Sequence, residues 1–301
     1  MKRIWLCIVL TICISSILNS QPITPSHVIL IGIDGMLGEG LRASKTPAID
    51  SLAKAGCISW KTRSVMPSVS APNWSAILSG AGPEQTGVTN NAWTFGKHSL
   101  EPTERDQTGY FPTVFSVLKI QMPEAKTCMF YDWDWLGQYI NNSLVTKMEL
   151  LTGYQNVTNS ALAYITAEKP LFSFIYYGHP DEVGHEKGFM TEEYKQSLND
   201  IDKEVGKIVK AVKKAGMFEK TVFIIVTDHG GVDKSHGGET PAEMEIPWII
   251  EGPGMRKGKV LTKPNDNMNT AMTIILMLNL TPPESWVARP VFEAFDLQGP
   301  E

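Results

Sequence analysis

Three aspartates and three histidines stand in short polar motifs, each of which follows a β-branched, apolar stretch of the sequence. They are Asp34, Asp181, His185, Asp228, His229 and His236. Carboxylate and imidazole groups are the ligands with which proteins hold zinc and similar divalent ions. Three aspartates and three histidines at successive strand ends are expensive to bury without cations. The six residues are therefore candidate metal ligands.

Each motif also has a simpler explanation. An Asp-Gly pair such as Asp34-Gly35 after a strand is usually only a turn. An Asp-His pair such as Asp228-His229 more often makes ordinary hydrogen bonds than a metal site. The recurrence of the pattern at several strand ends is what favours a metal centre.

A serine-rich segment, residues 67–79, supplies a candidate nucleophile. Pro72 and Asn73 are typical of a turn and a helix start, which places Ser70 at a helix N-terminus. Backbone N–H groups and the helix dipole favour an anion there. A serine hydroxyl needs activation before it attacks, and a metal ion can supply it. The alternative is that Ser70 and its neighbouring serines only cap the helix.

The elements that position these residues alternate along the chain. Strands are predicted at 27–33, 127–131, 171–177, 221–227 and 246–250, where short runs are apolar and β-branched. Helices are predicted at 46–55, where Pro47 takes the first position, at 192–215, which is amphipathic, and at 269–278. This alternation predicts an α/β fold with a mostly parallel central sheet flanked by helices on both faces. Functional residues of such sheets gather at the carboxyl ends of the strands.

The first 20 residues have the layout of a secretory signal peptide, with a basic start followed by an apolar run at 4–18. An uncleaved anchor is the alternative, but the run is shorter than the roughly 20 apolar residues that span a bilayer. We expect cleavage near Ser20, a single catalytic domain at 21–301, and no stable membrane span in the mature chain. Cys57 and Cys128 then remain, either as one disulfide or as two buried thiols.

The formal net charge of −5 gives no basic surface for a polyanion. We therefore expect no binding of nucleic-acid polymers.

The order of these residues, with Ser70-Ala71-Pro72-Asn73 after Asp34, resembles the alkaline phosphatase superfamily. Within it, the nucleotide pyrophosphatase/phosphodiesterase branch, also called type I phosphodiesterases, is the most similar. The resemblance extends over about residues 27–255. It implies two Zn²⁺ ions, other divalent metals being possible. Asp181, His185 and His236 would hold one ion, and Asp34, Asp228 and His229 the other, with Ser70 bound to the second ion as the nucleophile.

The resemblance also implies substrate contacts. Asn91 falls where the family has an asparagine that donates to a phosphoryl oxygen, with Asn90 as the neighbouring alternative. Tyr176 matches a position in a hydrophobic slot for the base. Asn73 either contacts the substrate or supports the nucleophile loop. Ala71 departs from nucleotide-cleaving members, which tend to carry an aromatic residue there, and the branch usually has threonine as nucleophile.

These features predict a secreted, extracellular or periplasmic, metal-dependent phosphodiesterase or pyrophosphatase. It would act on a small phosphoester through a phosphoseryl intermediate on Ser70. The alternatives are a phosphomonoesterase or phosphonate hydrolase on the same scaffold, and a non-catalytic secreted binding protein. Monoesterases of the superfamily add an arginine or a further metal near the phosphoryl group. Neither Arg63 nor Arg105 has a comparable setting, which favours a diester.

Overall fold

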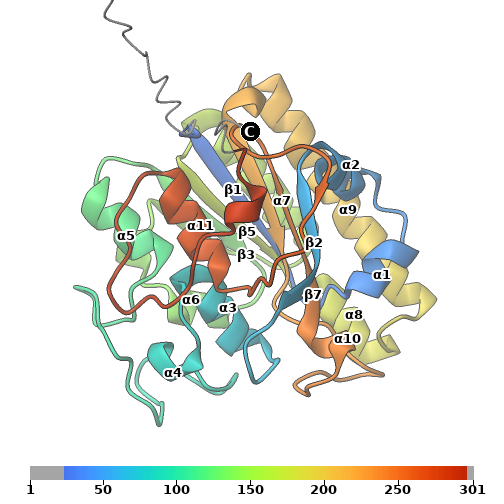
Figure 1. The fold of residues 1–301 in the computed structure, drawn as a ribbon, viewed down its shortest axis with the longest axis horizontal. Coiled ribbons are helices and arrows are strands. Elements are labelled where there is room, and N and C mark those ends of the chain that lie inside the picture. Colours follow the sequence, from blue (N-terminus) through green and yellow to red (C-terminus); the bar gives the residue numbers. More distant parts are fainter. Residues whose placement is uncertain (1–23, 297–301) are drawn as a thin grey trace, which may run out of the picture.

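The computed structural model describes residues 24–296, which pack around one sheet (Figure 1). Its strands are β1 His27–Ile33, β2 Cys57–Arg63, β3 Thr127–Tyr131, β4 Lys147–Leu150, β5 Phe172–Tyr177, β6 Thr221–Val226, β7 Glu245–Glu251 and β8 Lys259–Val260. They lie in the order β4-β3-β5-β1-β6-β7-β2-β8. All neighbouring pairs are parallel except those of β7, which is antiparallel to both β6 and β2. The predicted fold class is therefore confirmed.

The five predicted strands agree with β1, β3, β5, β6 and β7 to within one residue at each end. The antiparallel direction of β7 was not predicted, because the direction of a strand does not change the spacing of its apolar residues. β2, β4 and β8 were missed. β4 lies at one edge of the sheet and β8 at the other, where fewer residues are buried and the apolar signal is weak.

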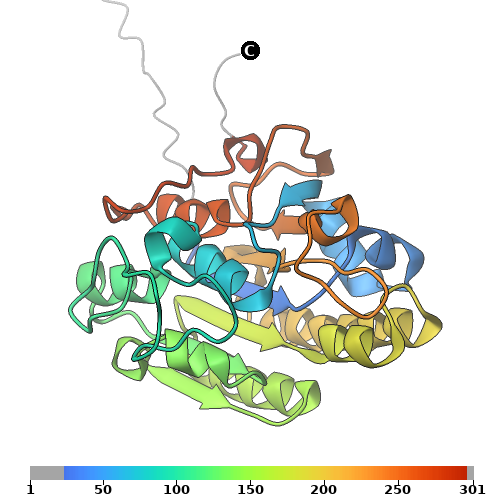
Figure 2. The ribbon, with the colours of Figure 1, turned by 90° about the horizontal axis from the view of Figure 1, so that it is seen from below.

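Helices cover both faces of the sheet (Figure 2). They are α1 Gly38–Ala43, α2 Pro47–Ala55, α3 Ser70–Ser79, α4 Pro83–Thr86, α5 Val114–Gln121, α6 Trp135–Tyr139, α7 Tyr154–Glu168, α8 His179–Lys187, α9 Glu192–Lys214, α10 Pro241–Met244 and α11 Asn269–Met277. Three single-turn 3₁₀ helices complete the list: η1 Asn142–Leu144, η2 Phe218–Lys220 and η3 Phe292–Ala294. The predicted helices correspond to α2, α9 and α11.

The central strand β1 shows how the two layers form. Val28 and Leu30 belong to a core shared with α3, α5 and α11, whereas Ile29 and Ile31 belong to a core shared with α2, α7 and α9. Side chains alternate between the two faces along a strand, so a continuous apolar run fills both cores. This double burial fixes the strand ends that carry the polar motifs.

Cys57 and Cys128 are both buried and unbonded. Cys57 lies on β2 and Cys128 on β3, and four strands separate β2 from β3. At about 4.8 Å per strand this distance is far beyond a disulfide. Burial raises the pKa of the Cys57 thiol to about 11 and that of Cys128 to about 12. Of the two possibilities, the buried thiols are correct.

None of the helices within residues 24–296 has the length and apolar character needed to cross a bilayer.

Candidate active site

The six candidate ligands come from three neighbouring strands. β5, β1 and β6 lie side by side and parallel, so their carboxyl ends meet at one edge of the sheet. Asp34 directly follows β1, and Asp228 and His229 follow β6. Asp181 and His185 lie on α8, which begins two residues after β5, and are separated by one helical turn.

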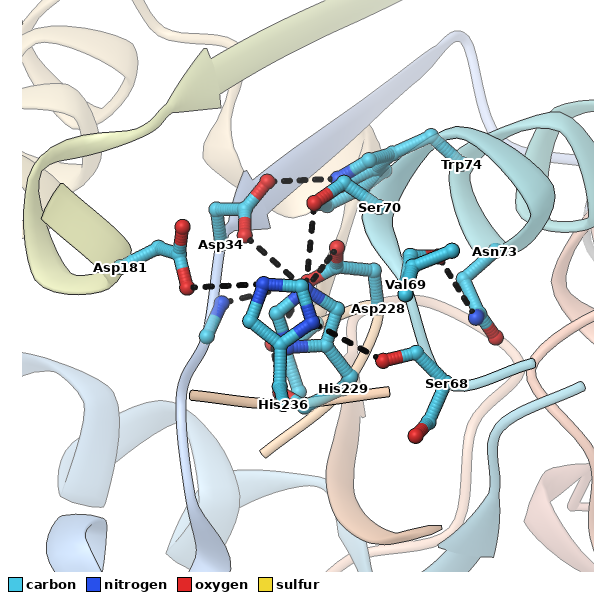
Figure 3. A network of polar contacts seen from close by, with 12 residues as sticks. Asp34, Ser68, Val69, Ser70, Asn73, Trp74, Asp181, Asp228, His229 and His236 are labelled. Carbon is cyan, nitrogen blue, oxygen red and sulfur yellow. Dashed lines mark hydrogen bonds and ion pairs between the residues drawn. The ribbon is translucent and has the colours of Figure 1, made fainter. Parts of the chain in front are cut away.

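A buried cluster forms from Asp34, Asp228 and His229, whose ligand atoms all lie within 4.8 Å of one another. His229 Nε2 is 3.0 Å from Asp228 Oδ2 and 3.5 Å from Asp34 Oδ1. Ser70 Oγ lies 3.1 Å from the same nitrogen, a contact that Figure 3 marks with a dashed line. The predicted nucleophile therefore stands next to the predicted ligands of one ion.

An outer cluster forms from Asp181, His185 and His236, again with ligand atoms within 4.8 Å. His185 Nε2 lies 3.3 Å from Asp181 Oδ2 and 3.1 Å from His236 Nε2. The His185 side chain is 45% exposed, whereas that of His229 in the buried cluster is fully buried. The rings of His229 and His236 stack with centroids 3.6 Å apart, which joins the two clusters.

The spacing of the donor atoms fits a tetrahedral zinc ion. Ligands bound at about 2.0–2.1 Å in a tetrahedron stand about 3.3–3.4 Å apart. The separations in the two clusters centre on this value. One oxygen of each carboxylate, Asp34 Oδ1, Asp181 Oδ1 and Asp228 Oδ2, is buried without a hydrogen-bond partner among the described residues. Buried carboxylate oxygens of this kind are costly without a nearby positive charge, which a bound cation would supply.

Backbone carbonyls hold all three imidazole rings in one tautomer. Nδ1 of His185 lies 2.9 Å from the Lys234 oxygen, and Nδ1 of His229 lies 2.8 Å from the Gly230 oxygen. Nδ1 of His236 lies 3.0 Å from the oxygen of Ser68. A carbonyl only accepts, so Nδ1 carries the proton and Nε2 is left as the ligand atom. Such outer contacts orient metal-binding histidines in general.

The electrostatics of the buried cluster also call for positive charge. Burial, followed by the neighbouring carboxylates of Asp228 and Asp181, raises the pKa of Asp34 well above its usual range. Burial opposes a charge on His229, but the carboxylates, Asp228 foremost, outweigh it and raise its pKa to about 10. In the absence of a metal ion, a proton on His229 thus supplies part of the missing charge.

Ser70 is the first residue of α3, as predicted, and is 5% exposed. The N-terminus of α3 offers a substrate fewer free backbone N–H donors than the sequence indicated. The Ala71 N–H donates to Asn91 Oδ1 at 2.8 Å, and Pro72 has no N–H. Asn91 therefore lies beside the nucleophile, and its NH₂ group has no partner among the described residues. The alternative residue, Asn90, instead accepts from Ala92 N at 2.9 Å within its own turn.

Tyr176 does not line a substrate slot. It is 2% exposed, and its hydroxyl donates to Asp34 Oδ2 at 2.5 Å. Trp74 Nε1 donates to the same oxygen at 2.9 Å, and Trp74 is fully buried. Both aromatic residues hold Asp34 so that its other oxygen faces the buried cluster. The sequence carried a signal for Trp74, because it follows Ser70 by four residues and therefore shares its helix face.

Asn73 takes the second of its two predicted roles. It is fully buried, and its Nδ2 lies 3.0 Å from the Pro67 oxygen and 2.9 Å from the Val69 oxygen. Its Oδ1 accepts from Val65 N at 2.7 Å. Both ends of the amide are thus used by the loop that leads to Ser70, and no exposed atom is left for a substrate.

Substitution of Tyr176 by Phe tests its contact with Asp34. The ring would stay packed, but Asp34 Oδ2 would lose its 2.5 Å hydrogen bond. Loss of an outer contact of this type weakens metal binding by about 10- to 100-fold. We expect such a loss for zinc, measured by competition with a chromophoric chelator. Tyr177→Phe is the control, because the Tyr177 hydroxyl bonds Thr158 on the other side of the sheet.

Comparisons with known proteins agree with this geometry. The family model described as type I phosphodiesterase / nucleotide pyrophosphatase matches residues 28–245. The chain therefore belongs to this family of metal-dependent phosphodiesterases and pyrophosphatases, within the alkaline phosphatase superfamily.

Two relatives illustrate the distance within the family. Bis(5'-adenosyl)-triphosphatase ENPP4 of Bos taurus is 22% identical over 221 residues, which cover 70% of this chain and 49% of that protein. Ectonucleotide pyrophosphatase/phosphodiesterase family member 3 of Mus musculus is 26% identical over 222 residues, covering 67% of this chain and 24% of that protein. The chain thus matches half or less of the length of these relatives.

Solved structures share the fold. An inactive variant of murine ectonucleotide pyrophosphatase/phosphodiesterase 5 in complex with AMP superposes with a TM-score of 0.73 at 16% identity. The match covers 89% of this chain and 98% of that chain. A 2-O glycosaminoglycan sulfatase superposes with a TM-score of 0.68 at 15% identity, covering 89% of this chain and 73% of the other. At these identities the likeness concerns the fold alone.

Proposed function

We propose that this protein is a two-zinc phosphodiesterase or pyrophosphatase that uses Ser70 as its nucleophile. The observation that carries the proposal is the position of Ser70 Oγ, 3.1 Å from a histidine of the buried cluster, with the outer cluster joined to it by a stacked imidazole pair. Charge supports the same conclusion. Three carboxylates and a serine alkoxide carry four negative charges, which two Zn²⁺ ions balance.

Bound zinc would lower the pKa of the Ser70 hydroxyl and stabilise charge on the oxygens of the substrate. Ser70 Oγ would attack phosphorus, forming an O–P bond as the bond to the leaving group breaks. Water would then attack the phosphoseryl group and release Ser70. The NH₂ group of Asn91, held by the Ala71 N–H, would donate to a phosphoryl oxygen. Asp34 keeps its orientation through Trp74 and Tyr176.

The arginines support a diester or pyrophosphate substrate. A monoester dianion requires more positive charge around phosphorus than a diester monoanion. Arg63 pairs with Glu245 at 3.0 Å, and Arg105 pairs with Glu101. The other three described arginines, Arg42, Arg256 and Arg289, contact Trp60, Phe295 and Pro264. Each described arginine is therefore engaged away from the two clusters.

The names of the relatives make nucleotides natural substrates to test, because they include a diadenosine triphosphatase and an ectonucleotide pyrophosphatase. Ala71 and Tyr176 are both buried, so a stacking contact with a nucleotide base has to come from other residues. Trp74 and Trp93 are also buried, at 0% and 7% exposure.

We also propose that the protein is secreted and that residues 21–301 form one catalytic domain. The predicted signal peptide at 1–20 lies outside the described residues. The basic and apolar layout of that segment and the ectoenzyme name of one relative support secretion.

A substrate panel tests the function. We expect the mature protein to hydrolyse bis-p-nitrophenyl phosphate and a p-nitrophenyl nucleotide ester with a higher kcat/KM than p-nitrophenyl phosphate. EDTA should remove the activity and zinc should restore it. A higher kcat/KM on the monoester would show that the protein is a phosphomonoesterase and not a phosphodiesterase. Bound zinc without turnover of any substrate would indicate a binding protein.

A further inference from the structure

Glu243 is a buried acid outside both clusters that holds the loop carrying His236. It lies on α10, between this loop and β7, and is 7% exposed. Its carboxylate accepts three hydrogen bonds. Oε1 accepts from Gly238 N at 2.8 Å, and Oε2 accepts from Thr240 N at 3.2 Å and from Thr240 Oγ1 at 2.7 Å. Burial alone would raise the pKa of Glu243, but these hydrogen bonds hold it below its usual value.

Part of this arrangement is an ordinary capping box. Thr240 caps α10, and Glu243 at the third position returns a hydrogen bond to it, which is how many helices begin. The contact with Gly238 goes beyond that motif, because Gly238 lies outside the helix on the side of His236. A Cβ at Gly238 would come within 2.6 Å of Glu243 Oε2, so glycine is what permits the close approach.

Gly238 in turn joins the His236 loop to the nucleophile loop. Ser68 Oγ donates to the Gly238 oxygen at 2.6 Å, and His236 Nδ1 donates to the Ser68 oxygen at 3.0 Å. Ser68 is fully buried and precedes Ser70 by two residues. Figure 3 shows Ser68 beside His236. A circuit of three hydrogen bonds therefore runs from Glu243 through Gly238 and Ser68 to His236.

The main chain of Glu243 is linked to the buried cluster through Gly230. Its carbonyl accepts from Gly230 N at 2.9 Å, and the Gly230 carbonyl accepts from His229 Nδ1 at 2.8 Å. A side-chain substitution of Glu243 leaves this second chain of contacts intact. The carboxylate therefore acts through His236 of the outer cluster, whereas the main-chain link from Glu243 to His229 does not depend on it.

We propose that Glu243 is a positioning residue that orients His236 through Gly238 and Ser68, and so sets the metal affinity of the outer cluster. The inference rests on the proposed two-zinc function, but it concerns residues that touch neither zinc nor substrate. It predicts that one of the two zinc ions becomes weakly bound when the circuit is broken.

Glu243→Gln is the first test. Glutamine keeps the size of the side chain, but it has no charge and only one acceptor oxygen, so the hydrogen bonds from Gly238 N and Thr240 N cannot both be kept. We expect about 10- to 100-fold weaker affinity for one zinc ion and unchanged affinity for the other, as for other outer contacts of metal-binding histidines. The measurement is zinc competition with a chromophoric chelator, together with native mass spectrometry to count the ions. Glu239→Gln is the matched control, because Glu239 is exposed in the same loop.

Further substitutions identify the weakened subsite. In the Glu243→Gln background, Asp181→Ala should leave the remaining zinc in place, whereas Asp228→Ala should remove it. Ser68→Ala breaks the circuit from the other side, without touching the capping box. It should give the same one-zinc defect, and the double variant Ser68→Ala/Glu243→Gln should be no worse than either alone, because both act on one circuit.

The outcomes separate this inference from the proposed function. If Glu243→Gln only lowers the melting temperature of the metal-free protein and binds both zinc ions with wild-type affinity, Glu243 is a helix cap and the inference is wrong. Should Glu243→Gln fail to fold, wild-type zinc affinities in Ser68→Ala would overturn the inference in the same way. Wild-type protein that takes up no zinc would instead overturn the proposed function.

Discussion

Ser70→Ala should abolish phosphodiester turnover while the protein still folds and binds zinc. Only the hydroxyl group is lost, and the start of α3 is held by other contacts, among them the hydrogen bond from Ala71 N to Asn91. Removal of a nucleophile from a hydrolase lowers kcat by about 10³- to 10⁶-fold, and the other groups of the site maintain a small residual rate. We expect a loss in this range with bis-p-nitrophenyl phosphate.

The measurement combines steady-state kinetics with a zinc count. Wild-type protein should also release a burst of p-nitrophenol, up to one equivalent, if the phosphoseryl group is hydrolysed more slowly than it forms. Ser75→Ala is the control, because Ser75 lies on the same helix and its hydroxyl donates to the Pro72 carbonyl at 2.8 Å rather than to a residue of either cluster. Undiminished turnover in Ser70→Ala would show that the nucleophile is another group, such as a water molecule.

Asp34→Asn should have opposite effects on the metal-free protein and on its zinc-bound form. Asp34 is 2% exposed, and its Oδ1 has no hydrogen-bond partner among the described residues. Without a cation, burial first and then the carboxylates of Asp228 and Asp181 oppose a charge on Asp34, which raises its pKa well above the usual range. An asparagine removes that charge and keeps an oxygen for the hydrogen bonds from Trp74 and Tyr176. Replacement of buried charged groups by neutral ones of similar volume is often neutral or stabilising, by about 1–4 kcal/mol.

We therefore expect the metal-free Asp34→Asn protein to melt several degrees above the metal-free wild type, since about 1 kcal/mol corresponds to roughly 2–4 °C in a chain of this size. Zinc should stabilise the variant less than the wild type, and turnover should fall by at least about 100-fold. Thermal melts with EDTA and with zinc measure both effects.

Asp202→Asn provides the contrasting control. Asp202 is also buried, but its two oxygens accept from Ile49 N at 2.8 Å and Ala48 N at 3.2 Å. There the NH₂ group of asparagine would face a donor, so the variant should be less stable by about 1–3 kcal/mol with or without zinc. A metal-free Asp34→Asn protein that melts below the metal-free wild type would contradict the view that the buried Asp34 carboxylate destabilises the metal-free folded state.

The sequence predicted which residues meet, because parallel strands bring their carboxyl ends to one edge. Asp34, Asp181 and Asp228 follow β1, β5 and β6, which are adjacent in the sheet. The order of the strands could not be predicted from periodicity alone, and it was the resemblance to a known family that implied how the six ligands divide into two groups. Ser70 at the start of α3 was predicted from the turn residues Pro72 and Asn73.

The roles of the supporting residues were less predictable. Tyr176 was expected near a substrate, but whether an aromatic ring lines a slot or fills a core depends on its neighbours in space. Trp74 and Glu243 act on the site through hydrogen bonds to partners distant in sequence or outside their own helix. The spacing of Trp74 from Ser70 places it on the same helix face, but the distant partners of these hydrogen bonds leave no spacing pattern in a single sequence.

The scattering of the ligands along the chain has a consequence for the order of folding. β1, at the centre, pairs with β5 and β6, which follow it by well over a hundred residues. Closing loops of this length is slow, and the pocket does not exist until they are closed. Only Asp181 with His185, and Asp228 with His229, are neighbours beforehand. Zinc is therefore expected to bind late, to a chain that has already formed its sheet. Its binding would stabilise the folded state rather than direct the formation of the sheet.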